Sequence, residues 1–418
     1  MKFISRRNFL EATAASAALP SLRAGAASEI GTRLPPEMKT FTDPETGRAI
    51  RQFTSARANS YPLYYFTASI TLDGRYMVYH SERSGWVQLY RMDLETGESV
   101  QLTEGRTLNS GWAMFCQWRL RGIYNHRSAF NRVKSEVYYF QDEELRATHL
   151  ETLANRVVYR MTGRLCIGQS DFSPDGRHFA FIHADRRVYT DVMTELEPVY
   201  NTRVISPNVP PPIPATIGMI DTETGKYSDI LKLDYHVHHV LWVDDRRVLV
   251  NHLPDGLGMW ITGIDGSGKR DLRAPAQQGR INHQVVTPKG IFYDTTRRWV
   301  GRYDETSGAF EAAALPEIDG SLHIGFDPAG RFLFCEHQGS ANRLVSLHFP
   351  HDPKRRQLKT LRSMKPYFEP QQRYHAHPFL SPDRKWLFHT ELLDGYSQIA
   401  AIDVRDLVDR DEYWDSKT

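Results

Sequence analysis

The feature that most constrains this chain is a sequence unit that recurs with a period of about 40–55 residues. Each unit begins with a D-G or S-P-D-R turn and continues with a short run rich in Val, Ile, Tyr, Phe and Trp. After a loop, a second run ends in D-x-x-T-G before a further strand-like run. Such runs favour β-strands, and Gly, Asp and Pro favour the turns between them. The copies lie at 71–103, 114–151, 172–231, 241–272, 285–313, 326–349 and 379–404.

These units predict an all-β fold, a seven-bladed β-propeller in which each blade is a four-stranded antiparallel sheet. Residues 28–418 are expected to form this propeller as a single catalytic domain. The D-x-x-T-G endings suit tight hairpins between outer strands. The Pro-rich stretch 206–216 is expected to be a stiff loop inside the third blade rather than a domain linker. The alternative is a pair of sandwiches built from unrelated hairpins, and the repeated turn phrase argues against it.

Composition excludes several classes of protein. With 40% hydrophobic and 24% charged residues, the 418-residue chain is not a disordered protein, a collagen or a coiled coil. Its 52 basic and 50 acidic residues form no basic stripe, so we expect no nucleic-acid partner. Cys116, Cys166 and Cys335 form no C-x-x-C pair, which excludes a disulfide framework and a thiolate zinc site.

The N-terminus has the features of an export signal. Residues 1–27 combine a charged start, an Ala/Leu-rich stretch and an A-x-A cleavage site. Arg6 and Arg7, within S-R-R-N-F-L, match the bacterial twin-arginine signal, and an ordinary Sec signal is the alternative. The stretch is too short and too polar to span a membrane. We therefore expect a periplasmic or secreted protein with no membrane insertion after cleavage, and export in the folded state would allow a metal to be loaded inside the cell.

Histidines recur at one structural phase of consecutive units. Seven of these histidines lie just before the turns of their units, and His252 ends the first hairpin strand of the fourth unit. In a propeller this phase corresponds to the innermost strand, so the side chains are expected to meet around the axis. The set before the turns comprises His236, His238, His239, His283, His323, His375 and His377.

The H-x-H pair suggests a metal site. We expect His375 and His377 to lie on a strand, where alternation places both imidazoles on one face and lets them chelate one divalent ion. Gln372, and His283 from the neighbouring blade, could complete the site. Three imidazoles and an amide oxygen suit Mn, Fe, Co, Ni or Zn better than Ca or Mg. The alternative is that these are ordinary inner-strand histidines with hydrogen bonds to the backbone.

The H-V-H-H run at 236–239 offers a candidate base, because a neutral imidazole accepts protons near pH 7. Core packing is the alternative, and we favour it for His236. The chain has no serine nucleophile elbow, Walker loop, dinucleotide-binding glycine pattern or H-E-x-x-H motif. The phosphate-loop-like stretch 263–270 falls in a predicted hairpin turn with no helix after it, so we do not interpret it as a phosphate site.

From residue 43 to about residue 404, the chain resembles the oligogalacturonate lyases, seven-bladed propeller polysaccharide lyases that act on short pectin fragments. The resemblance rests on Y-Y-F-T-A-S-I-T-L-D-G-R-Y-M-V-Y, L-E-T-G-E-S-V-Q-L-T-E-G-R, the spacing of His238 and His252, I-N-H-Q, and Q-x-x-H-x-H-P at 372–378. The last motif is the most specific. The resemblance implies that Mn²⁺, or another divalent transition metal, is bound by His283, Gln372, His375 and His377.

The resemblance also implies a catalytic histidine base near the start of the fourth blade, which falls on His239 or His238. His239 is preferred, because a shortening of the following turn would align it with the family's phrase. The family's arginine on the strand before the base has no counterpart at 214–221, and Arg186, Arg187 or Arg203 could supply it from loops. The candidate substrate-binding residues are His252, Arg186, Tyr61, which replaces a family histidine, Tyr374 and His323.

The expected reaction is β-elimination at a 4-linked uronate of an oligosaccharide substrate, which yields a 4,5-unsaturated sugar. Two alternatives stay open. The same architecture supports enzymes that act on other uronate glycans, including glycoside hydrolases, whose products contain no conjugated double bond. It also supports non-catalytic periplasmic binding propellers of the TolB type. A propeller of that type is expected to have a featureless mouth, and the histidine cluster argues against it.

Overall fold

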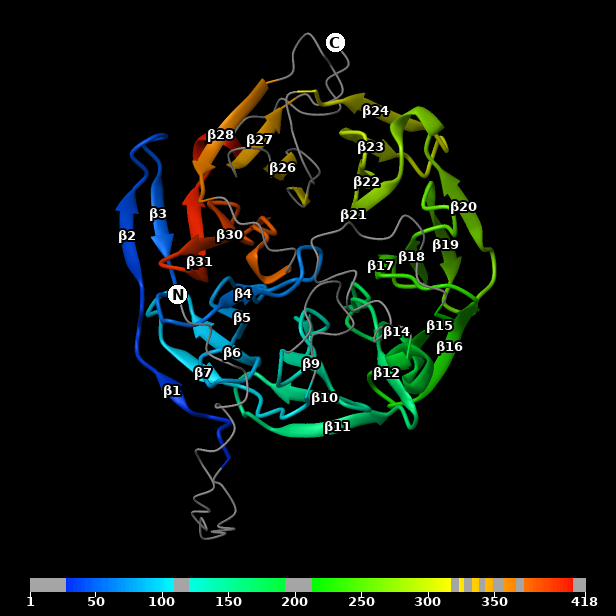
Figure 1. Ribbon diagram of the computed structural model, residues 1–418, viewed down its shortest axis with the longest axis horizontal. Helices are drawn as coiled ribbons and strands as arrows, with labels where there is room; N and C mark the ends of the chain where they lie inside the picture. Colours follow the sequence, from blue (N-terminus) through cyan, green and yellow to red (C-terminus); the bar gives the residue numbers. More distant parts are fainter. Residues whose placement is uncertain are drawn as a thin grey trace, which may run out of the picture.

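The structure is a computed structural model, and it describes residues 28–108, 120–191, 213–316, 323–326, 333–337, 343–348, 357–365 and 372–408. Seven antiparallel sheets surround a central axis like the blades of a propeller (Figure 1), which confirms the predicted fold. Four blades have four strands and three have five, so the expected uniform blades are found only in part. The predicted signal, residues 1–27, and most of the Pro-rich stretch lie outside the described residues.

The first three blades follow the chain in order. The first contains β4 (Ser60–Pro62), β5 (Tyr76–Ser81), β6 (Gln88–Asp93), β7 (Ser99–Gln101) and, on its outer edge, β1 (Arg33–Leu34). The second contains β8 (Ala129–Asn131), β9 (Glu136–Gln141), β10 (Glu144–His149) and β11 (Asn155–Arg160). The third contains β12 (Arg164–Cys166), β13 (Asp171–Phe172), β14 (His178–Asp185), β15 (Ala215–Asp221) and β16 (Tyr227–Leu233).

The next three blades have four strands each. The fourth contains β17 (His239–Asp244), β18 (Arg247–Asn251), β19 (Gly258–Gly263) and β20 (Arg270–Arg273). The fifth contains β21 (Ile281–Thr287), β22 (Gly290–Thr295), β23 (Trp299–Tyr303) and β24 (Phe310–Ala314). The sixth contains β25 (Ile324–Phe326), β26 (Leu333–His337), β27 (Arg343–His348) and β28 (Gln357–Ser363).

The seventh blade is built from both ends of the chain. Its inner strands are β29 (Phe379–Leu380), β30 (Trp386–Leu393) and β31 (Tyr396–Asp403), and its outer strands are β3 (Ala49–Gln52) and β2 (Lys39–Thr42). The short helices are η1 (Ala276–Gln278), η2 (Gln372–Tyr374) and α2 (Arg405–Val408). No helix in the described part of the chain has the length and apolar character needed to cross a membrane.

Strand position within a blade explains the burial pattern. Neighbouring blades cover both faces of a central strand, so β15 is buried at every residue except its last. The outermost strand β16 has a single buried residue, Ile230, because its outer edge faces solvent. Apolar side chains of adjacent blades therefore meet in clusters between the sheets, and the core is a ring around the axis.

The D-x-x-T-G phrases form the predicted hairpins. In copies at 93–97 and 221–225, the Oδ1 atoms of Asp93 and Asp221 accept the backbone N–H groups two and three residues further on. Gly97 and Gly225 have φ angles of 79° and 70°, in the left-handed region that glycine adopts without strain. A further copy at 43–47, between β2 and β3, has the same Asp–backbone hydrogen bonds.

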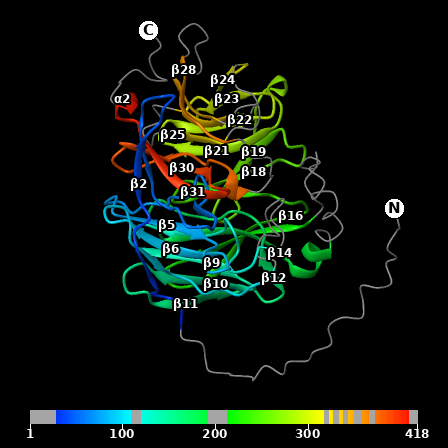
Figure 2. The ribbon, with the colours of Figure 1, turned by 60° about the vertical axis from the view of Figure 1, so that its left-hand side comes forward.

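The N-terminal segment closes the ring. Strand β1 pairs with β7 of the first blade, and β3 pairs with β31 of the last, with Ile50 opposite Ile402. Figure 2 shows this segment, in blue, running along the outside of the ring. The first blade and the last blade are thus held together by the stretch of chain between β1 and β3.

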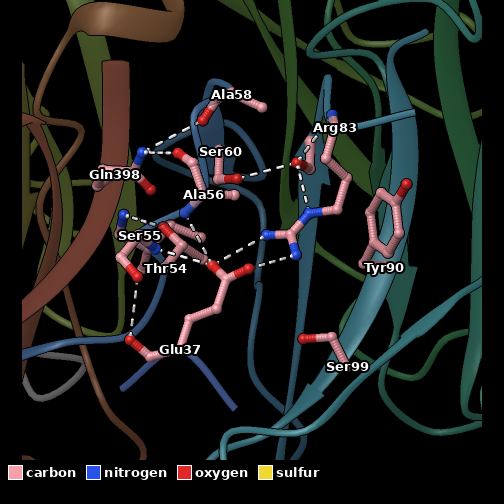
Figure 3. Close-up of polar contacts among 12 residues, drawn as sticks. Glu37, Thr54, Ser55, Ala56, Ala58, Ser60, Arg83, Tyr90, Ser99 and Gln398 are labelled. Atoms are coloured by element: carbon pink, nitrogen blue, oxygen red, sulfur yellow. Dashed lines mark hydrogen bonds and ion pairs between the residues drawn. The ribbon is translucent and has the colours of Figure 1, made fainter. Parts of the chain in front are cut away.

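An ion pair reinforces this closure (Figure 3). Glu37, between β1 and β2, pairs with Arg83 of the first blade, with 2.9 Å from Oε1 to Nη1. Its Oε2 also accepts the backbone N–H groups of Ser55 and Ala56, at 2.8 and 3.1 Å. Gln398, on β31, donates to the carbonyl oxygen of Ala56. These contacts connect the crossing segment to both blades that it joins.

Candidate metal centre and active site

The inner ends of five blades bring aromatic and imidazole side chains to the axis. Tyr64 follows β4, His239 begins β17 and His283 lies on β21. His323 directly precedes β25, and His377 lies two residues before β29. Their rings are in contact: the ring centroids of His283 and His323 are 4.3 Å apart, and those of His323 and His377 are 4.5 Å apart. The structure therefore gathers around the axis the histidines that the repeat placed at one phase.

The candidate metal ligands are His323, His375 and His377, whose ligand atoms all lie within 4.8 Å of one another. His323 Nδ1 donates to Glu336 Oε2 at 2.8 Å. His323 Nε2 is buried without a hydrogen-bond partner among the described residues. Burial lowers the pKa of His375 to about 3, and that of His377 well below its ordinary value, so both imidazoles are neutral near pH 7. Neutral imidazoles with a buried, unused nitrogen fit a divalent transition metal.

Two predicted ligands, His283 and Gln372, are not among these three histidines. His283 packs against His323, and its Nδ1 donates to the buried carboxylate of Asp294 at 3.0 Å. This contact orients the ring and leaves Nε2 as the atom available to a metal. Gln372 lies in η2, close in sequence to the H-x-H pair, but its side chain is outside the described residues. His323, predicted to bind substrate, lies instead within the imidazole group.

The prediction that the H-x-H pair lies on a strand is wrong. His375 and His377 follow η2, and β29 begins only at Phe379. Pro378 supplies no backbone N–H to a ladder, and His377 has a φ of 43°, which a strand does not adopt. The segment is instead fixed by the carbonyl of Ala376, which accepts the Thr390 N–H at 2.8 Å. The two imidazoles therefore approach each other through a loop.

The histidines at the start of the fourth blade lie beside this centre. His239 is buried, and its Nδ1 and Nε2 contact Asn251 Nδ2 at 2.7 Å and the Tyr64 hydroxyl at 3.2 Å. His238 is half-buried, and its ring lies 5.7 Å from that of His252. Burial lowers the pKa of both His238 and His239 well below the ordinary value, and the pKa of His252 to about 4. All three are therefore neutral proton acceptors or donors near pH 7.

The other predicted substrate-binding residues, Tyr61, Tyr374 and Arg186, differ in their burial and in their contacts. Tyr61, on β4, is buried, and its hydroxyl donates to Asn125 Oδ1 at 2.7 Å. Tyr374, in η2, is half-buried beside Arg373. Arg186 is half-exposed, and in the described part of the chain it pairs with Glu143 rather than with a histidine. Arg187 is almost fully exposed, and Arg203 lies outside the described residues.

Sequence reasoning missed His126 and Arg127, which lie shortly before β8 of the second blade. The His126 ring lies 5.6 Å from that of His377 and 4.9 Å from that of Tyr61. Arg127 is fully buried, and its guanidinium nitrogens have no hydrogen-bond partner among the described residues. Its guanidinium carbon lies 5.4 Å from the centroid of the Tyr124 ring. The second unit is degenerate in sequence, so its inner residues could not be aligned with those of the other blades.

Solved structures of two lyases share this fold. An oligogalacturonate lyase from Vibrio parahaemolyticus superposes with a TM-score of 0.72 at 19% identity, over 90% of this chain and 98% of that chain. An oligogalacturonate lyase in complex with manganese superposes with a TM-score of 0.73 at 18% identity, with the same coverage. No protein-family model matches the sequence, and no curated protein is significantly similar to it. The predicted resemblance is thus confirmed at the level of the fold.

Proposed function

We propose that this protein is a metal-dependent lyase that cleaves uronate-containing oligosaccharides, such as pectin fragments, by β-elimination. The observation that carries the proposal is the group of His323, His375 and His377, whose ligand atoms lie within 4.8 Å of one another on the propeller axis. The names of the structural neighbours support it, because both are oligogalacturonate lyases and one contains manganese.

The donor set fits a divalent transition metal such as Mn²⁺. His323, His375 and His377 would hold it, and His283 lies close enough to His323 to add a further imidazole. The sequence resemblance adds Gln372. When bound, such a cation stabilises the second negative charge that develops on the substrate carboxylate as the C5 proton leaves.

The chain's own residues supply the proton chemistry. A neutral imidazole of the pair His238 and His239 takes the proton from C5 of the uronate. The C5–H electron pair becomes the second bond between C4 and C5, and the bond between C4 and the glycosidic oxygen breaks. Its electron pair stays on the leaving oxygen, which takes a proton from water. Tyr64 and His252 lie next to these imidazoles and are our candidates for orienting the sugar.

The burial of Arg127 is evidence that the substrate is an anion. A fully buried cation without a compensating anion costs several kcal/mol, and the described residues give the Arg127 guanidinium no hydrogen-bond partner, so its presence beside His126 points to a negative charge that arrives with the ligand. Arg127→Met is expected to raise KM for uronate oligosaccharides about tenfold or more, while the free energy of unfolding stays equal or rises. Steady-state kinetics and urea unfolding measure the two effects. Loss of stability together with activity would instead make Arg127 a structural residue.

The decisive test is direct. The mature protein is incubated with di- and trigalacturonate after chelation and again after Mn²⁺ is restored, and ultraviolet absorbance follows the unsaturated product. We expect absorbance to rise only when the metal is present, and His375→Ala to abolish both metal retention and the rise. New reducing ends without absorbance would show a hydrolase instead. Activity in metal-stripped His375→Ala protein would overturn the metal's role.

We further propose that residues 1–27 direct export through the twin-arginine route. The S-R-R-N-F-L sequence supports this. Replacing Arg6 and Arg7 by lysine is expected to retain the protein in the cytoplasm, as measured by cell fractionation. Unchanged export of the double variant would favour an ordinary Sec signal.

A further inference from the structure

Three successive blades place a polar side chain of the second strand opposite a histidine of the inner strand. In the fourth blade, β17 and β18 pair so that Asn251 lies opposite His239. In the fifth, Asp294 contacts His283, and in the sixth, Glu336 contacts His323. In each blade the second-strand side chain contacts Nδ1 of the histidine, and its chemistry differs: it is an amide in the fourth blade and a carboxylate in the fifth and sixth.

The carboxylates determine which imidazole nitrogen carries the proton. Asp294 and Glu336 are acceptors, so His283 and His323 each donate Nδ1–H to them and keep a lone pair on Nε2. A lone pair on Nε2 is what a metal ligand or a proton acceptor requires. In these two blades the inner histidine is therefore prepared to use Nε2 as an electron-pair donor.

The amide in the fourth blade has the opposite effect. Asn251 Oδ1 accepts the backbone N–H of His239 at 2.9 Å, and its Nδ2 donates to the carbonyl oxygen of Asn282 at 3.2 Å. These two backbone contacts fix the amide's orientation. With oxygen and nitrogen exchanged, the amide N–H₂ would face the N–H of His239 and the amide oxygen would face the carbonyl oxygen of Asn282. The nitrogen that faces His239 Nδ1 at 2.7 Å is thus an N–H donor, so Nδ1 accepts and Nε2 carries the proton.

We propose that Asn251 is a positioning residue that holds His239 protonated at Nε2, so that His239 donates a hydrogen bond and the adjacent His238 takes the C5 proton. His239 Nε2 lies 3.2 Å from the Tyr64 hydroxyl, which accepts this hydrogen bond. The Tyr64 hydroxyl is then oriented with its own proton turned away from His239. His238 is the more exposed of the two imidazoles and so the more accessible to substrate. The assignment of the base rests on the proposed lyase function; the tautomer does not.

The tautomer can be observed without any activity. The mature chain is labelled with ¹⁵N at histidine and loaded with Zn²⁺, which is diamagnetic, and the His239 signals are identified by their loss in His239→Gln. We expect an unprotonated Nδ1 and a protonated Nε2. In Asn251→Asp, the carboxylate is expected to accept Nδ1–H, which moves the proton from Nε2 to Nδ1. A wild-type His239 protonated at Nδ1 would overturn the proposal.

The consequence for catalysis is tested with matched variants. Asn251→Asp is expected to lower kcat about 10²-fold or more, because the donor at Nε2 is lost. Asn131→Asp is the control. Asn131 is equally buried, its Oδ1 also accepts backbone N–H groups and its Nδ2 also donates to a backbone carbonyl oxygen. It lies at the end of β8 in the second blade, next to the turn. In Asn131→Asp, as in Asn251→Asp, the new carboxylate is repelled by a backbone carbonyl oxygen, but no histidine changes its hydrogen bond.

Substitution of the two histidines separates their roles. A glutamine at 239 keeps an amide donor near the position of Nε2, so His239→Gln should retain at least tenfold more activity than His239→Ala. His238→Gln and His238→Ala should be equally inactive. If His239 is the base, both of its variants will be inactive and Asn251→Asp will keep or gain activity, which overturns the assignment. If the wild type shows the expected tautomer but no elimination, the lyase proposal fails and the positioning role of Asn251 stands.

Discussion

At the scale of single residues, the chemistry of the centre depends on the side chains behind the histidines. Glu336 is fully buried and accepts His323 Nδ1–H at 2.8 Å, so it both orients the ring and increases the electron density at Nε2. Asp294 does the same for His283. Both carboxylates are fully buried beside the imidazole group, where a bound cation would offset their charge.

Glu336→Gln is therefore expected to weaken metal binding about 10–100-fold, because the amide carries no charge and orients the imidazole less strictly. Competition with a chromogenic chelator measures the affinity. Glu305→Gln, which removes a carboxylate from an ion pair with Arg247 in the fourth blade, is the control. An unchanged affinity in Glu336→Gln would show that His323 is not a ligand.

The sequence predicted the histidines of the fourth to seventh blades, but neither His126 nor the residues behind the histidines. The histidines stand out because H-x-H and H-V-H-H are unusual strings. Asn251, Asp294 and Glu336 lie 12, 11 and 13 residues after their histidines. This variable separation depends on the length of each hairpin and on a bulge in β21, which the sequence does not reveal. Arg127 was missed for a similar reason, since its unit lacks the turn phrase that sets the register.

At the scale of elements, the hairpins show how closely local sequence determines structure. The Asp of each D-x-x-T-G phrase caps two backbone N–H groups, and the glycine takes the left-handed conformation that ends the turn. These interactions are local, so the phrase was predictive wherever it occurred. The H-x-H segment shows the opposite case: its conformation depends on a contact with Thr390 in another strand, and the strand prediction failed.

Gly225→Ala tests the local requirement. The φ of Gly225 is 70°, and a Cβ added there would meet no atom within 4 Å, so the substitution adds backbone strain without a steric clash. We expect a loss of about 1–2 kcal/mol in the free energy of unfolding, measured with urea. Gly225→Asn should lose less, because asparagine tolerates this conformation. Equal losses in the two variants would contradict the explanation.

At the scale of the whole molecule, the number of blades was predictable and their closure was not. Seven similar units give the count directly, since each unit forms one sheet. The last unit ends without a D-x-x-T-G phrase, and the N-terminal region contains an unassigned copy at 43–47. The sixth unit also lacks the phrase, so these signals indicate a further hairpin at the N-terminus but not the blade that it completes. Pairing between β3 and β31 depends on distant residues, so no local pattern shows it.

Glu37→Gln tests the closure. Its carboxylate binds Arg83 and two backbone N–H groups, and the side chains of the pair are only 22% and 11% exposed. We expect a loss of about 1–3 kcal/mol in the free energy of unfolding. A double-mutant cycle with Arg83→Met isolates the pair. Lys385→Met, which removes an exposed ion pair with Asp383, should change stability by less than about 0.5 kcal/mol. Similar losses in both would contradict a role in closure.

The pairing of Ile50 with Ile402 has a consequence for biosynthesis. β3 pairs with β2 on one edge, but its other edge has no partner until β31, near the end of the chain, has been made. The ring therefore cannot close during translation, and a chain that stops before β31 leaves the exposed edge of β3 open to other strands. Such high contact order slows folding. Closure of the ring is therefore a check that synthesis has passed β31: only a polypeptide that contains this strand can complete its last blade.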